Sequence, residues 1–120
     1  MGRTDRLVDF PDAFADLCAK VIKPALRDVM KHNNPGWLGV RDAPGKTDPD
    51  PNKFSTFNRQ VSLQIKNFAE LSFVAWNPDV KVVRRRNGED DEDLGLYPLH
   101  EITRQLVENI AAQFLASLRR

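Results

Sequence analysis

The chain has 120 residues, which suits one domain, and 41% of them are hydrophobic, which excludes a wholly disordered chain. The formal net charge of +1 excludes a uniformly basic protein of the kind that coats nucleic acid. No apolar stretch has the length of a membrane helix, and no secretory signal precedes the first helical pattern. The single cysteine suits a reducing compartment, so we expect a cytoplasmic protein without a membrane partner.

The first predicted element is an amphipathic helix that follows a flexible N-terminus, residues 1–8. Apolar residues recur at three- and four-residue steps from Phe10 to Met30, and Asp9 is a suitable N-cap. Pro24 interrupts this segment, but the apolar stripe keeps its phase across the proline. We therefore expect a kinked helix and not a broken one.

A long loop is predicted over residues 35–53, where prolines and glycines follow one another closely. Trp37 in this loop either folds back to plug the core or is exposed as an anchor for a partner, together with residues 41–53. Lys46 lies in a Gly-Lys-Thr sequence, but the earlier glycine of a phosphate-binding loop is missing and prolines follow. The loop is therefore not predicted to bind nucleotides.

The middle of the chain is predicted to be rich in strands. Residues 60–66 alternate between apolar and polar, which favours a strand, although the apolar residues of 55–69 also share one helical face. Segments 71–76 and 80–86 are predicted strands joined by a tight turn at residues 77–79. Trp76 is expected to lie at a strand end and to pack on a helix.

An acidic hairpin loop is predicted over residues 87–94, because Asn-Gly at 87–88 is typical of a two-residue turn. Such a turn would place three arginines opposite three acids, and opposite charges across a hairpin stabilise it. The expected pairs are Arg86 with Glu89, Arg85 with Asp90, and Arg84 with Asp91. In this register the arginines are neutralised, and they are free only if the acidic stretch swings away.

The last predicted element is a helix from about Pro98 to Leu118. Together these elements predict a single α+β domain over residues 1–120, in which a kinked N-terminal helix and a C-terminal helix pack on a three- to four-stranded antiparallel sheet as two layers. An exposed sheet edge in such a domain also predicts a homodimer, because pairing protects the edge.

Residues that suggest catalysis are few. His32 and His100 have no partner at a metal-ligand spacing, and Cys18 falls inside the apolar stripe of the first helix. Asp79 followed by Lys81, with Glu70 one strand earlier, has the local form of a metal-dependent nuclease site. We predict no catalytic residue, no metal site and no cofactor, and keep the nuclease as a second alternative.

The sequence therefore favours a non-enzymatic module that binds another protein or assembles with it. Its expected contacts are an aromatic loop and a hairpin with charges of both signs, namely Trp37, Arg84, Arg85, Arg86, Glu89, Asp90 and Asp91. The first alternative is a nucleic-acid-binding protein, in which the Arg84–Arg86 strand contacts phosphates.

Overall fold

The computed structural model describes residues 10–33, 38–43, 60–65, 69–76, 78–86 and 88–117. Its helical elements are α1 (Phe10–Leu17), the π-helical turn η1 (Cys18–Ile22), α2 (Lys23–Asn33), the 3₁₀ turn η3 (Leu99–Glu101) and α3 (Arg104–Ser117). Its strands are β1 (Leu38–Ala43), β2 (Gln60–Ile65), β3 (Ala69–Trp76), β4 (Asp79–Arg86) and β5 (Glu92–Pro98).

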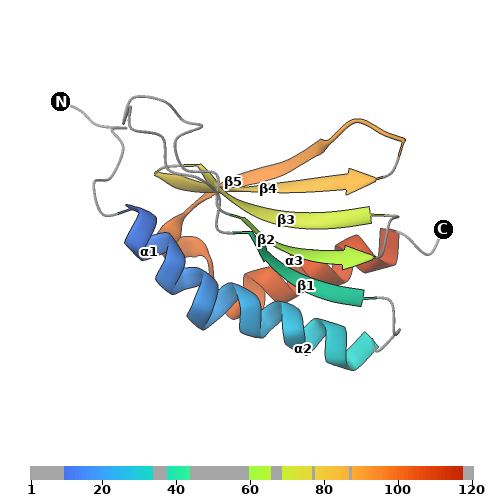
Figure 1. Ribbon diagram of the computed structural model, residues 1–120, viewed down its shortest axis with the longest axis horizontal. Coiled ribbons are helices and arrows are strands. Elements are labelled where there is room, and N and C mark those ends of the chain that lie inside the picture. The colour runs from blue at the N-terminus through green and yellow to red at the C-terminus, as the bar shows by residue number, and fades with distance from the viewer. Residues whose placement is uncertain are drawn as a thin grey trace.

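These strands form one five-stranded antiparallel sheet in chain order, and the helices lie on one of its faces (Figure 1). The predicted two-layer α+β fold is confirmed, and the described sheet has five strands in place of three to four. The described part of the chain contains no helix with the length and apolar character needed to cross a membrane.

The N-terminal helix continues past Pro24, as predicted. α1 leads into the π-helical turn η1, in which the Lys23 N–H bonds the Cys18 carbonyl, and α2 follows directly. Because proline has no N–H to donate and its ring crowds the carbonyl four residues earlier, a wider turn beside it relieves both problems. The apolar stripe stays in phase across this turn and is buried, as shown by Phe14, Ile22 and Leu26.

Alternation along the strands gives the sheet two distinct faces. On β3 the residues Leu71, Phe73 and Ala75 are buried in the core under the helices, and the side chains between them point to the opposite face. The predicted strand at 60–66 is confirmed for residues 60–65, and the strands predicted at 71–76 and 80–86 are confirmed as parts of β3 and β4.

Strand β1 corrects the prediction of a continuous loop over residues 35–53. It pairs with β2 from Leu38 opposite Ile65 to Ala43 opposite Gln60. The sequence signal for this strand is a short alternation in which Leu38 and Val40 are apolar. The neighbouring prolines and glycines favoured a loop more strongly than this alternation favoured a strand. The remaining residues of that loop, and the N-terminal segment 1–8, lie outside the described residues.

The C-terminal third corrects two predictions, because it contains a strand that was not predicted and its helix begins later than expected. β5 begins at Glu92, inside the predicted acidic loop, and ends at Pro98, where the last helix was expected to begin. α3 begins at Arg104 because Thr103 caps it, with its Oγ1 accepting a hydrogen bond from the Leu106 N–H at 3.1 Å. The helix packs beside α2 and closes the core with Val107, Ala111 and Phe114.

Candidate docking site on the open face of the sheet

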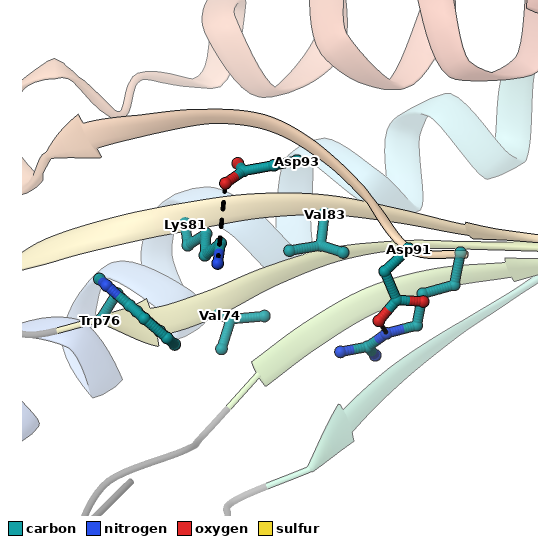
Figure 2. A pocket seen from close by; sticks show the side chains of 7 residues that line it. Val74, Trp76, Lys81, Val83, Asp91 and Asp93 are labelled. Atoms are coloured by element: carbon teal, nitrogen blue, oxygen red, sulfur yellow. Dashed lines mark hydrogen bonds and ion pairs between the residues drawn. The ribbon is translucent and has the colours of Figure 1, made fainter. Parts of the chain in front are cut away.

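The face of the sheet opposite the helices carries no other helix or strand among the described residues, and we call it the open face (Figure 1). A hollow of about 190 Å³ lies on it, over strands β3, β4 and β5. We call this hollow the open-face groove, and its lining residues are Val74, Trp76, Lys81, Val83, Arg85, Asp91 and Asp93. Figure 2 shows the two valines between Trp76 at one end and Asp91 at the other.

Strand register positions these side chains side by side. Val74 lies opposite Lys81, and Lys81 lies opposite Leu96, so one row crosses three strands. The next row along the strands joins Val83 to Asp93. Because residues two apart on a strand share a face, the same alternation that buries the core places these side chains on the open face.

The first end of the groove is built around Trp76. The Nζ of Lys81 lies 4.3 Å from the centre of the Trp76 ring, which is a cation–π distance. The same ammonium lies 3.7 Å from Asp93 Oδ2, across the hairpin (Figure 2). The indole is 37% exposed, so it is positioned by the lysine and still accessible.

Arg85 organises the other end. Its Nε donates to Asp91 Oδ2 at 3.2 Å, and its Nη1 donates to Glu70 Oε1 at 3.4 Å and to the buried Ser72 hydroxyl at 3.3 Å. A third Nη1 contact reaches Gln60 Oε1 at 3.2 Å. The planar, always charged guanidinium suits such a set of acceptors better than an ammonium does. Arg85 therefore ties β2, β3, β4 and the hairpin together.

All three arginines of β4 have acidic partners. Arg84 pairs with Glu92, Arg85 with Asp91 and Glu70, and Arg86 with Glu89 at 3.8 Å. The predicted pair of Arg86 and Glu89 is confirmed. The pairs of Arg85 with Asp90 and of Arg84 with Asp91 are wrong by one residue.

A register shift explains the error. A tight turn forms where it was predicted, since the Glu89 N–H bonds the Arg86 carbonyl at 3.0 Å and Gly88 has φ of +83°. Beyond the turn one additional residue enters the second strand, so Arg84 lies opposite Glu92. A second irregularity follows between Val82 and Val83. Bulges of this kind are common on edge strands.

The acids of the hairpin are more exposed than its cations. The side chains of Lys81, Arg84, Arg85 and Arg86 are between 22% and 36% exposed, whereas their partners Glu89, Asp91, Glu92 and Asp93 are between 52% and 62% exposed. Asp90 is exposed as well. The charges of both signs predicted for this hairpin are present, but the negative ones face outward.

The residues of the nuclease alternative do not meet. Glu70 lies opposite Arg85, and Asp79 lies opposite Trp76, at the other end of the same pair of strands. Six residues along a strand separate them by about 20 Å, too far for both carboxylates to bind one ion. Within the described residues no group of three or more metal-ligating side chains comes together.

Other predicted residues have different outcomes. Trp37 lies outside the described residues. Cys18 is buried, as its place in the stripe indicated. Trp76 lies at a strand end, as expected, but the prediction that it packs on a helix is wrong, because it occupies the open face. Along β3, Trp76 alternates in phase with Glu70 and Ser72 and out of phase with the core residues Leu71 and Phe73. This alternation is the signal in the sequence that places Trp76 on the open face.

A second hollow, of about 290 Å³, lies between the β4–β5 hairpin and α3. Its floor includes Tyr97, Ile110 and Phe114, which pack on the core. The Arg84 Nη1 donates to Ser117 Oγ at 3.2 Å across it. This hollow is part of the seam between the layers, so the open-face groove is the stronger candidate for a binding site.

Comparison of the chain with models of protein families, with curated proteins and with solved structures finds no match.

Proposed function

We propose that this chain is a non-enzymatic protein-binding module and that its partner docks on the open-face groove. The observation that carries the proposal is the accessible Trp76 beside an apolar floor, with charged side chains around it, on the open face of the sheet. Grooves of this composition supply both an anchor and orientation to a protein partner.

Trp76 supports the proposal because tryptophan is enriched among residues that dominate binding energy. Its contact with Lys81 holds the ring in one position before binding, which lowers the entropy lost when a partner covers it. Val74 and Val83 continue the apolar surface from the ring toward the hairpin. A partner that covers this strip removes apolar area from water and gains affinity.

The ion pairs of the hairpin favour a protein partner over nucleic acid. Phosphates are bound by cations that face solvent. Here Arg84, Arg85 and Arg86 each have an acidic partner that is more exposed than the arginine itself. A phosphate backbone that approaches the hairpin therefore meets carboxylates first and is repelled. We also propose that the protein is cytoplasmic and that Trp37 contributes to binding the partner.

An affinity purification from lysate of the host cell tests the proposal. The wild-type chain, Trp76→Ala and the control Arg27→Ala, whose residue is exposed on α2, are compared with and without nuclease treatment. We expect the wild type and the control to retain the same protein after nuclease, and Trp76→Ala to retain at least about tenfold less of it. Equal retention by Trp76→Ala, or loss of the protein on nuclease treatment, would contradict the proposal.

A further inference from the structure

We infer that the partner segment in the open-face groove is an extended peptide segment with an apolar side chain near Trp76 and lysine or arginine side chains near Asp93 and Asp91. This inference rests on the proposed function and specifies the partner's chemistry. Three properties of the groove lead to it: an apolar end, an acidic end, and the distance between them.

The apolar end is wider than Trp76 alone. Lys81 lies between Val74 and Leu96 in the sheet register, and Leu96 is 52% exposed. The aliphatic stem of Lys81 extends toward the Trp76 ring, so it joins apolar surface on β3 to apolar surface on β5. An exposed tryptophan and leucine beside the half-buried Val74 and the buried Val83 favour an aliphatic or aromatic side chain from the partner.

At the acidic end, carboxylates outnumber the cations that pair with them. Arg85 is shared between Glu70 and Asp91, so one cation faces two carboxylates. Asp93 pairs with Lys81 through Oδ2 and accepts the Gly95 N–H through Oδ1 at 3.2 Å. An ionised carboxylate has about four acceptor positions, so these contacts leave capacity for further donors. Because Asp91 and Asp93 are 59% and 62% exposed, a partner's cation reaches them before it reaches Arg85 or Lys81.

The distance between the ends matches an extended chain. The row of Trp76 and the row of Val83 and Asp93 are four residues apart on β3, which corresponds to about 13 Å. The row of Arg85 lies two residues further, at about 20 Å from Trp76. In an extended peptide, side chains on one face recur every second residue, at about 7 Å. The apolar residue and the basic residues are therefore expected four and six positions apart.

The exposed carboxylates of this groove, Asp91 and Asp93, favour a basic segment over nucleic acid and acidic peptides. Opposite charge on the partner speeds association and fixes its direction along the groove, because only one orientation brings cations to Asp91 and Asp93. The reversed orientation would leave the partner's cations at the Trp76 end of the groove and its apolar residue beside the Asp91 carboxylate.

The test titrates the full chain and, in parallel, the chain carrying Trp37→Phe, in which Trp76 is the remaining tryptophan and its emission reports on the groove. The probe is a peptide of about seven residues whose termini are blocked and uncharged. Its first residue is leucine, lysines follow four and six positions later, and the other residues are serine or glycine. One control peptide replaces both lysines by glutamate, and another replaces leucine by glycine. A single-stranded oligonucleotide of similar length is the third control.

We expect the leucine–lysine peptide to change the Trp76 emission in a saturable way and to bind at least about tenfold more tightly than each control. The variant with both Asp91→Asn and Asp93→Asn should bind the peptide at least about tenfold more weakly than the wild type. The control Glu101→Gln, on the turn that contacts α1, should bind the peptide with unchanged affinity. The substitutions are to asparagine and not to lysine, because a lysine at either position would lie beside Lys81 and Arg85. Circular dichroism checks that the asparagine variants fold. Asp93→Asn alone is the substitute if the double variant unfolds.

Equal binding of the glutamate peptide or the oligonucleotide, or unchanged affinity in the Asn variants, would overturn the basic-segment inference. Failure of the proposed function looks different, because Trp76→Ala would then retain the same protein from lysate as the wild type. A partner that is lost with Trp76→Ala but retained by the Asn variants would leave the docking face in place and contradict only the chemistry assigned to its occupant.

Discussion

At the scale of single residues, Arg85 is the side chain with the widest set of contacts on the open face. It joins the half-buried carboxylate of Glu70, the buried hydroxyl of Ser72 and the exposed carboxylate of Asp91. The strands pair through their backbones without Arg85. The polar groups beneath its guanidinium, in contrast, depend on Arg85 for hydrogen bonds. Buried polar groups that lose a partner cost more free energy than exposed ones.

Replacing Arg85 by alanine should therefore lower the free energy of unfolding by about 1–3 kcal/mol, because Glu70 and Ser72 lose a charged donor. Arg85→Lys should recover only part of this loss, since an ammonium cannot reproduce the planar set of donors. Urea denaturation measures both. Arg41→Ala, at an exposed position of β1, is the control and should change the free energy by less than about 0.5 kcal/mol.

Gly95 is a second residue whose identity is set by its surroundings. Its φ of +146° is rare for residues with a Cβ, and an added Cβ would lie 3.0 Å from Tyr97 Cε2. Gly95→Ala should destabilise the protein by about 1–3 kcal/mol, measured as a shift of the denaturation midpoint. Gly39→Ala is a matched control, because a Cβ there meets no atom of the described chain within 4 Å. A larger loss at Gly39 than at Gly95 would contradict this account.

At the scale of elements, the two helical segments α2 and α3 meet in two ways. Arg104 forms an ion pair with Asp28 across their surface, where both side chains are about half exposed. Underneath, Leu26 of α2 and Ile22, the last residue of the preceding turn η1, join Val107 in the fully buried core. Exposed ion pairs contribute little because water and salt screen them, whereas buried apolar side chains contribute through area and packing.

We therefore expect Asp28→Asn to change the free energy of unfolding by about 0–1 kcal/mol and Ile22→Ala to lower it by about 2–5 kcal/mol. Thermal and chemical denaturation of the two variants, under the same buffer, measure the difference. An effect of Asp28→Asn as large as that of Ile22→Ala would mean that the ion pair, and not the core, holds the helices together.

The same elements show what the sequence could predict. Long periodic patterns were sufficient for the N-terminal helix and for β2, β3 and β4, because burial of one face enforces the period. β1 was missed because only two apolar residues, Leu38 and Val40, carry its pattern. β5 was not predicted as a strand because Glu92 and Asp93 disfavour strands in isolation, and their pairing with Arg84 and Lys81 compensates in the fold.

The candidate site was predictable only in part, for a related reason. Local spacing indicated that acids and arginines would pair across a turn, but the one-residue shift of register depends on how β5 fits against β4. The predicted partner contact was Trp37 and not Trp76, although the alternation of β3 places Trp76 on the same face as Glu70 and Ser72. Which faces of a sheet receive helices is a property of the assembled fold, so the groove could not be foreseen from spacing alone.

At the scale of the whole molecule, the sheet has two edge strands, β1 and β5, since each pairs with a single neighbour among the described strands. The β5 edge carries features that oppose pairing with another sheet, namely the irregular register between Val82 and Val83, the charged residues Glu92 and Asp93, and Pro98. These features oppose pairing through β5, and the homodimer through an exposed sheet edge stays a prediction.

Removing that protection should make the protein self-associate. Glu92→Thr combined with Asp93→Thr replaces two edge charges by residues that favour strands and leaves Leu94 and Leu96 exposed beside them. Sedimentation velocity over a range of concentrations should show a larger, concentration-dependent species for this variant than for the wild type. Glu101→Thr, which removes an exposed acid outside the strand, is the control and should sediment as the wild type does. If the double variant also sediments as the wild type does, then the charges of Glu92 and Asp93 are not what protects this edge.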